Sequence, residues 1–557
     1  MSFILYLVLL FTHYTSTWGA PHVTTAQVNL TYEIHQGWLN TTGNFYNFSN
    51  IPYATPPVGN LRFLAPTAPT VPSNPPVNDG SRYAVCPQGI PLWTSVATDW
   101  LTNGIGVINQ SAGYPIPHVT TLPPVLPGTS EDCLLLDVLV PKTIFDNRAS
   151  GSGAPVVTWI HGGGFTLGWK TQYGSGVGLL KASQAHGKTG VIYVAINYRL
   201  GLFGFLSGPT FSSQGGTANN GLLDQRMAIE WVQANIHKFG GDPNKVTVMG
   251  ESAGGGSTIH QVTAYGGLKG KVPFQKAIIQ SGAFLPVPGP VRPENIFQKF
   301  LARGNLTDLS AARAATTKQL QLANAILVGE APFGDFTFNG SFAPDLPGKL
   351  LLSGGYDKSL TLLIGHNDDE GLFFTSPFLP EGDEETFKKN VVLVSFPDAD
   401  ATNASSYILN TLYPPIFDGS QPSGSQGQGY TNEIARGDYI VSEALFACNA
   451  EYLARAFGTS AYAYDFSVPP ALHGNDIPYT FYEGPATAVL NGSLALIMQD
   501  YFTNFMINGN PNRAGLVNFP NYGSGKLLLD FFTDAVTLVT DFLDNDRCKW
   551  WQKALYY

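Results

Sequence analysis

Short apolar runs alternate with helical patterns along much of this chain. Five runs end in glycine or polar residues and have the length of buried strands: residues 155–160, 190–198, 246–249, 276–282 and 360–365. Between them, segments such as residues 221–240 carry apolar side chains at spacings of three and four, which predicts helices. This alternation predicts an α/β fold with a mostly parallel sheet, and reactive groups at the carboxyl ends of its strands.

The predicted strand at residues 246–249 leads directly into the sequence GESAG at residues 250–254. This is the GxSxG pattern, in which a serine lies on a sharp turn from strand to helix with its hydroxyl exposed. Gly250 and Gly254 permit the close backbone approach that such a turn needs. Because so short a motif also occurs by chance, Ser252 is a candidate nucleophile only if its partners are present.

A serine hydroxyl needs a basic histidine, and that histidine needs an orienting carboxylate. In α/β hydrolases the order along the chain is nucleophile, acid, histidine. His473 is the only histidine after the acidic stretch at residues 365–371. His260 lies in the helix that follows Ser252, and His366 precedes the acids, so neither fits the order.

The acid and the oxyanion donors are less sharply defined by the residues alone. Asp368, Asp369 and Glu370 all follow the strand at 360–365 closely, and the pattern leaves the choice between them open. HGGGF at residues 161–165 follows the strand at 155–160, and glycine amides can approach a developing oxyanion without obstruction. The amide of Ala253, the residue after the candidate nucleophile, is the expected partner of this loop.

Composition adds an export hypothesis. Charged residues make up 13% of the 557-residue chain, against about 25% in typical soluble domains, so we expect glycans to help solvate the surface. Residues 1–19 have the short apolar run and small residues of a cleavable signal peptide, although no Lys or Arg precedes the run. No later segment carries about 18 consecutive apolar residues, as a membrane span would need.

Eight N-x-S/T sequons agree with a secreted glycoprotein. They are Asn29, Asn40, Asn47, Asn109, Asn305, Asn339, Asn403 and Asn491. The net charge of −10 argues against a nucleic-acid partner, which would require a basic surface. No charge run or repeat divides the chain, and residues 418–429 are interpreted as a surface loop.

Four cysteines in an exported chain are expected to pair, and sequence order leaves three connectivities open. Cys86, Cys133, Cys448 and Cys548 show no CxxC spacing and no neighbouring histidine cluster, so we expect no zinc site. No cofactor motif is evident either.

Several longer segments together resemble the type-B carboxylesterase and lipase family, the group that contains cholinesterases and secreted fungal lipases. They include IPYATPPVGNLRF (51–63), SEDCLLLDV (130–138), HGGGF, NYRLGLFGFL (197–206), NNGLLDQRMAIEWVQANI (219–236) and FGGDPNKVTVMGESAGG (239–255). The resemblance covers nearly the whole mature chain. It implies one α/β-hydrolase domain over residues 20–557, with a large, mostly parallel central sheet flanked by helices and a flap loop.

The resemblance also implies roles for individual residues. Ser252 matches the family's nucleophile, and the backbone amides of Gly163, Gly164 and Ala253 match its oxyanion donors. The glutamate of the family's D-E-G motif selects Glu370 from the three acids, and HGNDI is similar to the histidine segment of fungal lipases, which supports His473.

Disulfide pairing follows from the same resemblance. Cys133 lies in the family's E-D-C-L motif, so its expected partner is Cys86, across a flap loop. Cys448 and Cys548 then match the C-terminal disulfide of cholinesterases.

The function expected is that of a secreted serine hydrolase cleaving carboxylic esters, a carboxylesterase or lipase. Sterol or feruloyl esterase specialisation is an alternative that the residues leave open. A non-catalytic binding relative with the same fold is disfavoured, because such relatives generally lose triad members. The expected partner is a small-molecule or lipid ester; the acyl chain, the alcohol and the oligomeric state are not predicted.

The segment between Cys86 and Cys133 carries few charges and several apolar groups, among them Leu92, Trp93 and Trp100. A loop of this length within a compact domain is usually functional. We expect a flap over the site that opens at lipid interfaces, with a permanently packed apolar loop as the alternative. Cholinesterases carry a choline-stacking indole in this loop, but cation–π binding needs a defined cage, so an acetylcholine specialist is not expected.

Overall fold

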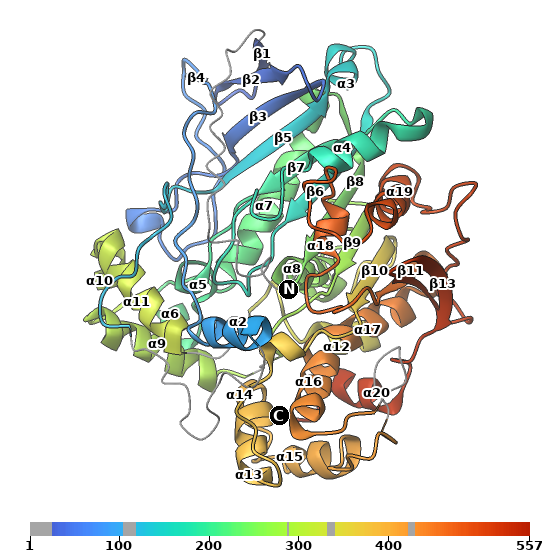
Figure 1. Cartoon of the computed structure of the whole chain (residues 1–557). Helices are drawn as coiled ribbons and strands as arrows, with labels where there is room; N and C mark the ends of the chain where they lie inside the picture. The colour runs from blue at the N-terminus through green and yellow to red at the C-terminus, as the bar shows by residue number, and fades with distance from the viewer. Residues whose placement is uncertain (1–24, 104–118, 287–288, 331–339, 422–428) are drawn as a thin grey trace.

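One mixed sheet organises the computed structural model, which describes residues 25–103, 119–286, 289–330, 340–421 and 429–557. Its strand order is β1-β2-β3-β5-β7-β6-β8-β9-β10-β11-β12-β13, and the short β4 pairs with β2 outside this series. Figure 1 shows the sheet running diagonally through the molecule, from β1 near the top to β13 at the right. The strands are β1 (Thr25–Asn29), β2 (Ile34–Asn40), β3 (Phe45–Pro52), β4 (Val77–Asn78), β5 (Leu135–Pro141), β6 (Ala154–Ile160), β7 (Ile192–Ile196), β8 (Gly241–Glu251), β9 (Lys276–Gln280), β10 (Thr361–Asn367), β11 (Ala461–Phe466), β12 (Leu527–Phe532) and β13 (Ala535–Thr540).

The strands from β7 to β12 are parallel to one another, and antiparallel strands extend the sheet at both ends. All five predicted strands belong to this parallel centre, as β6, β7, β8, β9 and β10. The α/β-hydrolase fold class expected from the sequence is therefore confirmed.

Helices cover both faces of the sheet (Figure 1). Helices α7, α8 and α17 pack on one face, while α19 packs on the other with α4 and α18 beside it. The longer helices are α2 (Trp93–Asn103), α4 (Val177–Gln184), α7 (Asn220–Asn235), α8 (Ala253–Val262), α9 (Val291–Gly304), α11 (Thr317–Glu330), α16 (Glu433–Ser442), α17 (Cys448–Phe457) and α19 (Gly492–Asn508). The shorter ones are α3 (Lys142–Asp146), α5 (Gly201–Phe205), α6 (Pro209–Ser213), α10 (Leu309–Ala314), α12 (Pro347–Ser353), α13 (Glu384–Phe387), α14 (Leu393–Ser395), α15 (Ala404–Tyr407), α18 (Ile477–Thr480) and α20 (Asp546–Gln552).

Two cores result, one on each face, because successive side chains of a strand point to opposite faces. On β8, Val248 belongs to the core beneath α7 and α8, whereas its neighbour Met249 belongs to the core beneath α19. Ile279 and Ile278 divide in the same way on β9. Burial on both faces explains why these strands appear in the sequence as continuous apolar runs.

Predicted boundaries differ from the structure by a few residues. The expected helix at 221–240 is α7 followed by a tighter turn at Ile236–Phe239, which ends where Gly240 adopts a φ of 93°. Glycine enters this left-handed region without steric cost, so the chain can reverse there into β8.

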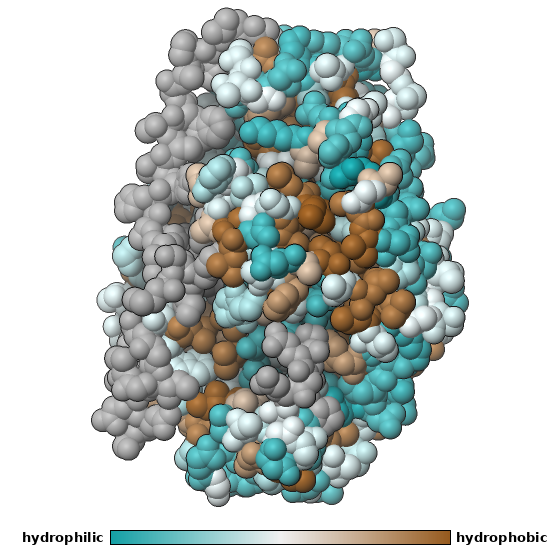
Figure 2. Space-filling view, turned by 45° about the vertical axis from the view of Figure 1, so that its right-hand side comes forward, coloured by the Kyte–Doolittle hydropathy of each residue, from teal (hydrophilic) through white to brown (hydrophobic). Residues whose placement is uncertain are grey.

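Apolar side chains gather near the middle of one face of the molecule and are bordered by polar ones (Figure 2). Among the described sequons, Asn29, Asn305 and Asn403 are exposed, while Asn40, Asn47 and Asn491 are half-buried. Asn109, Asn339, the expected signal peptide and most of the 418–429 loop lie outside the described residues. Within the described ranges, no helix combines the length and apolarity needed to cross a membrane.

Candidate active site

Ser252 lies between the end of β8 and the first residue of α8, in the backbone conformation of a sharp turn. Its φ is 55° and its ψ is −124°, a region that non-glycine residues rarely adopt. Two hydrogen bonds brace the turn, from the Ser252 amide to the Gln280 carbonyl and from the Ala283 amide to the Ser252 carbonyl, each 3.0 Å long. The surrounding backbone thus holds a strained residue in place.

The glycines after Ser252 let α8 start against the sheet. A Cβ on Gly254 would lie 2.0 Å from the carbonyl oxygen of Ile160, and one on Gly256 would lie 2.0 Å from that of Ala283. No side chain fits at such distances. The small residues that are conspicuous in the sequence therefore permit the close approach of helix and strands.

Ser252, His473 and Glu370 form a hydrogen-bonded series. The Oγ of Ser252 is 2.8 Å from Nε2 of His473, and Nδ1 of His473 is 2.5 Å from Oε2 of Glu370. All three side chains are buried, and Ser252 retains 9% of its exposure. The structure thus brings together the three residues that the sequence nominated as nucleophile, base and acid.

The histidine segment is fixed to the acid segment by the backbone. The amide of Asp369 donates to the carbonyl of Ala471 at 2.9 Å, which places Glu370 beside His473. Asp476, in the same HGNDI turn as His473, accepts hydrogen bonds from Gln280 at 2.7 Å and from Tyr464 at 2.8 Å. These contacts give a structural reason for the aspartate of this motif.

Ser281 and Asn367 complete the surroundings of Glu370, and the sequence analysis did not identify either. The hydroxyl of Ser281 and the backbone amide of Asn367 each donate to Oε1 of Glu370, both at 2.6 Å. Ser281 directly follows β9, and Asn367 ends β10. Their positions at strand ends next to the motif residues were the only signal that could have revealed them.

These contacts set the charges of the series. Burial alone would raise the pKa of Glu370, but the charge and hydrogen bond of His473, with the donors Ser281 and Asn367, bring the pKa below its ordinary value. Burial would lower the pKa of His473, but the charge and hydrogen bond of Glu370 raise it. The pair therefore favours an ionised carboxylate facing the imidazole.

The alternative acids lie in different surroundings. Burial raises the pKa of Asp369 to about 6, and its side chain is hydrogen-bonded to Asp438 on α16. The backbone amide of Asp368 donates to the carbonyl of Phe466 at 3.1 Å. The hydrogen bonds to His473 among the described residues thus involve Glu370 and neither aspartate.

The candidate oxyanion loop follows β6 and lies against the candidate nucleophile. A Cβ on Gly162 would be 2.9 Å from the carbonyl oxygen of Glu251 and 3.0 Å from the Cβ of Ser252, so a larger residue there would force the backbone to shift. The carbonyl of Gly162 accepts from Nδ1 of His161 at 2.8 Å, and the carbonyl of Gly163 accepts from the amides of Thr166 and Leu167 at 3.1 and 3.0 Å.

These carbonyls determine where the next amides point. In a trans peptide the N–H and C=O point in opposite directions, so the N–H groups of Gly163 and Gly164 face away from the loop's own hydrogen bonds. The carbonyl of Ser252 likewise accepts from Gly256 and Ala283, which turns the N–H of Ala253 outward. In the described part of the chain, none of these three amides donates within the turns and loops.

Glu251, immediately before the candidate nucleophile, is a buried acid close to the histidine. Its Oε1 is 3.4 Å from Nε2 of His473. Burial raises its pKa to about 8, and the neighbouring His473 offsets part of that rise. The sequence showed this glutamate inside the GESAG motif but did not reveal its charge state.

Phe374 and Phe446 form an aromatic wall beside His473. The rings of Phe446 and Phe374 have their centroids 4.6 and 5.1 Å from that of His473. Trp93, on α2 of the expected flap, packs on Phe373 and Phe374 at 5.4 and 5.6 Å. The Cys86–Cys133 segment therefore reaches the site, but residues 104–118 lie outside the described residues and the mobile flap stays a prediction.

The cysteines and the two other candidate histidines have surroundings of their own, outside the Ser252–His473–Glu370 series. Disulfides join Cys86 to Cys133 and Cys448 to Cys548, with Cα–Cα distances of 5.1 and 5.2 Å. His260 is buried on α8 with its ring 5.0 Å from that of Phe284, and His366 is 3.4 Å from Asp465. The described ranges contain no group of three or more His, Cys, Asp or Glu that could hold a metal ion.

Comparisons with known proteins show what this chain is similar to. The sequence model of the Carboxylesterase family matches residues 34–551. The chain is 38% identical to the carboxylesterase patB of Aspergillus clavatus, over 95% of this chain and 96% of that protein. It is 29% identical to the secreted triacylglycerol lipase LIP1 of Gibberella zeae, over 92% and 88% of the two chains. The crystal structure of Aspergillus niger EstA shares the fold, with a TM-score of 0.76 at 23% identity, over 96% of this chain and 98% of that one.

Proposed function

This chain belongs to the carboxylesterase family and is a carboxylic ester hydrolase, and from that premise we propose that it acts through an acyl-enzyme on Ser252. The observation that carries the proposal is the hydrogen-bonded series from Ser252 Oγ through His473 to Glu370. This is the arrangement that makes a weakly nucleophilic hydroxyl reactive at neutral pH.

In the first half-reaction, the Oγ of Ser252 attacks the ester carbonyl while Nε2 of His473 takes the hydroxyl proton. Glu370 holds the imidazole through Nδ1 and stabilises the imidazolium that forms. The amides of Gly163, Gly164 and Ala253 donate to the oxyanion of the tetrahedral intermediate. Collapse breaks the carbon–oxygen bond to the alcohol, which leaves with the proton from His473.

The second half-reaction releases the acid. A water molecule gives a proton to His473 and attacks the acyl carbonyl, and the same amides stabilise the second oxyanion. Collapse then returns the proton to Ser252 and frees the carboxylic acid. No metal or cofactor is needed to balance these steps.

A covalent label tests the nucleophile directly. A fluorophosphonate should add one equivalent to the active protein, and peptide mass spectrometry should locate it on Ser252. Labelling should compete with an ester substrate and be absent from Ser252→Ala. Stoichiometric inactivation with the label on another residue would refute the proposed nucleophile.

The substrate contains an apolar or aromatic group next to the scissile bond. The rings of Phe374 and Phe446 beside His473 favour such a group, and Trp93 extends the same wall. A panel of 4-nitrophenyl esters of rising chain length, with methyl ferulate and a sterol ester, distinguishes carboxylesterase or lipase activity from the feruloyl and sterol alternatives. A strong preference for acetate over every larger acyl group would contradict this assignment.

The protein is secreted and glycosylated. Two disulfides and the similarity to secreted fungal lipases support export. The amino-terminal sequence of protein recovered from culture medium tests cleavage after Gly19, and a mass loss on treatment with an N-glycosidase tests the sequons. Retention of the intact chain inside cells would overturn both.

A further inference from the structure

We propose that Gln88 is a positioning residue for the oxyanion hole, an inference that rests on the proposed function. Gln88 lies two residues after Cys86, in the stem of the disulfide loop, and it does not belong to the triad or the glycine loop. It acts through Gly168, which it binds in both directions. Substitution of Gln88 should therefore weaken the stabilisation of the transition state through the loop, and not through a contact with the substrate.

Two reciprocal hydrogen bonds join Gln88 to Gly168. Nε2 of Gln88 donates to the carbonyl of Gly168 at 2.9 Å, and Oε1 accepts from the amide of Gly168 at 3.2 Å. The next residue adds a third contact, because the amide of Gly89 donates to the carbonyl of Thr166 at 2.9 Å. The disulfide stem is thus bonded along the outer side of the oxyanion loop.

Gly168 in turn rests on the peptide that orients the first oxyanion donor. A Cβ on Gly168 would lie 2.4 Å from Nδ1 of His161 and 2.6 Å from the carbonyl oxygen of Gly162. Those two atoms form the hydrogen bond that fixes the direction of the Gly163 N–H. A shift of Gly168 therefore disturbs this hydrogen bond and with it the aim of the Gly163 amide.

The imidazole of His161 has no second N–H group with which to hold the loop in place of Gln88. Burial lowers its pKa to about 4, so it is neutral at physiological pH and donates through Nδ1 alone. That proton already binds the Gly162 carbonyl. Gln88 adds two hydrogen bonds to the loop from outside, both at Gly168.

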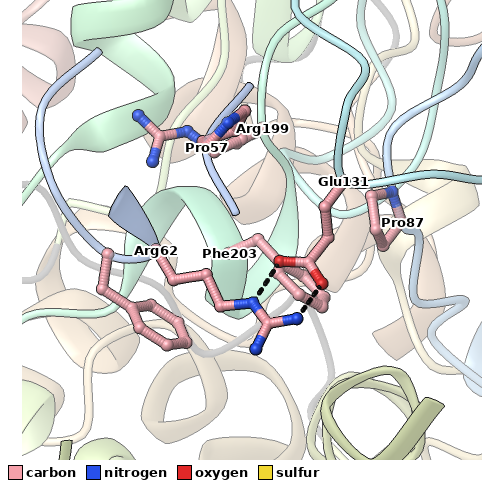
Figure 3. A pocket seen from close by; sticks show the side chains of 7 residues that line it. Pro57, Arg62, Pro87, Glu131, Arg199 and Phe203 are labelled. Carbon is pink, nitrogen blue, oxygen red and sulfur yellow. Dashed lines mark hydrogen bonds and ion pairs between the residues drawn. The ribbon is translucent and has the colours of Figure 1, made fainter. Parts of the chain in front are cut away.

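The stem itself is firmly held, as a positioning element must be. Cys86 is bonded to Cys133, and a Cβ on Gly89 would lie 2.8 Å from Val328 of α11, so Gly89 is packed on that helix. Near Pro87, Arg62 donates two hydrogen bonds of 2.7 Å to Glu131, drawn as dashed lines in Figure 3. Together with Pro87 they line a cavity of about 10 Å³, roughly room for one water molecule.

The decisive experiment compares Gln88→Leu with wild type on a soluble 4-nitrophenyl ester and with a trifluoromethyl ketone. The Oγ of Ser252 adds to the carbonyl carbon of the ketone. The resulting hemiketal carries an oxyanion that is stabilised by the same backbone amides as the tetrahedral intermediate. Removing one oxyanion donor outright costs about 10² to 10³ in kcat, so loss of its alignment should cost roughly tenfold. We expect kcat and ketone affinity to fall by the same factor while KM changes little.

Gln233→Leu is the matched control. Gln233 is also half-buried and its Nε2 also bridges distant segments, donating to the carbonyls of Pro243 and Pro273 at 2.8 Å. Gln233→Leu should lose about as much thermal stability as Gln88→Leu while keeping the kcat and the ketone affinity of wild type. Gln88→Glu supplies a second test should Gln88→Leu fail to fold, because an ionised carboxylate still accepts from Gly168 but cannot donate to its carbonyl.

Unchanged kcat and ketone affinity in a folded Gln88 variant would overturn the proposal, as would equal losses in Gln233→Leu. A fall in kcat with normal ketone affinity would also overturn it, because the oxyanion donors would then be intact. Failure of the proposed function is distinguishable, because then neither wild type nor the Gln88 variants would form a hemiketal on Ser252.

Discussion

The hydroxyl of Ser281 donates a hydrogen bond of 2.6 Å to one oxygen of Glu370, while the other oxygen of that carboxylate faces His473. The two oxygens of the acid therefore have separate partners. A hydrogen bond to the charged form keeps a buried carboxylate ionised, and it also prevents rotation of the carboxylate away from the imidazole. Ser281 thus supports the acid without contacting the substrate.

Ser281→Ala should lower kcat on the order of tenfold, because a hydrogen bond to a charged group contributes about 1.5–3 kcal/mol. The Asn367 amide still donates to the same oxygen, so the loss should be partial. Ser257→Ala is the control: Ser257 is fully buried on α8 and accepts from Gln225 at 2.8 Å, away from the acid. Equal kcat in the two variants would show that the Ser281 hydroxyl does not support Glu370.

Ser252→Ala should leave a folded protein whose ester turnover is lower by several orders of magnitude. Without the nucleophile, only the oxyanion donors and substrate binding remain, and these give roughly 10³ to 10⁴ over the reaction in water. Initial rates on a soluble ester, with calorimetry to verify folding, provide the measurement. Turnover near that of wild type in a preparation free of contaminating esterase would exclude the proposed mechanism.

Glu370→Gln should reduce kcat far more than Asp368→Asn or Asp369→Asn. Glu370 binds Nδ1 of His473, and an amide there cannot stabilise the imidazolium or hold the correct tautomer. The three variants control for one another, since each removes one carboxylate from the same segment. A larger loss in Asp369→Asn would transfer the role of the acid to that residue.

Much of the fold was predictable because the central strands are buried on both faces and therefore appear as apolar runs. The elbow, the HGGGF loop and the order of nucleophile and histidine carry strong local signals, since glycine and motif residues are required by backbone geometry. The choice of Glu370 needed the family resemblance, because Asp368 and Asp369 occupy equivalent positions along the chain.

Residues that act through contacts distant in sequence could not be predicted. Gln88 meets Gly168 across 80 positions, and Ser281 meets Glu370 across 89. An isolated glutamine or serine has no periodicity or motif to announce such a partner. Charge states were equally inaccessible, because burial shifts the pKa of Glu251 only once the sheet and helices are assembled.

Glu251 provides a test of that buried charge through pH-dependent stability. Burial raises its pKa from 4.5 to about 8, so the folded protein holds a proton on Glu251 between these values while the unfolded chain does not. Wild type therefore loses stability as pH rises through this window, by a few kcal/mol in order of magnitude. Glu251→Gln lacks this loss, so its Tm should rise relative to wild type from about pH 5 to about pH 8 and then stay level.

Calorimetry of both proteins across that pH range makes the measurement, with Glu230→Gln as control. Glu230 is exposed on α7, so its substitution should give a Tm difference that does not grow with pH. The sign is decisive, because a carboxylate ionised in the folded state would give no growing advantage to the glutamine. A difference between Glu251→Gln and wild type that is flat or shrinks over the window would mean that Glu251 is charged beside His473 at neutral pH.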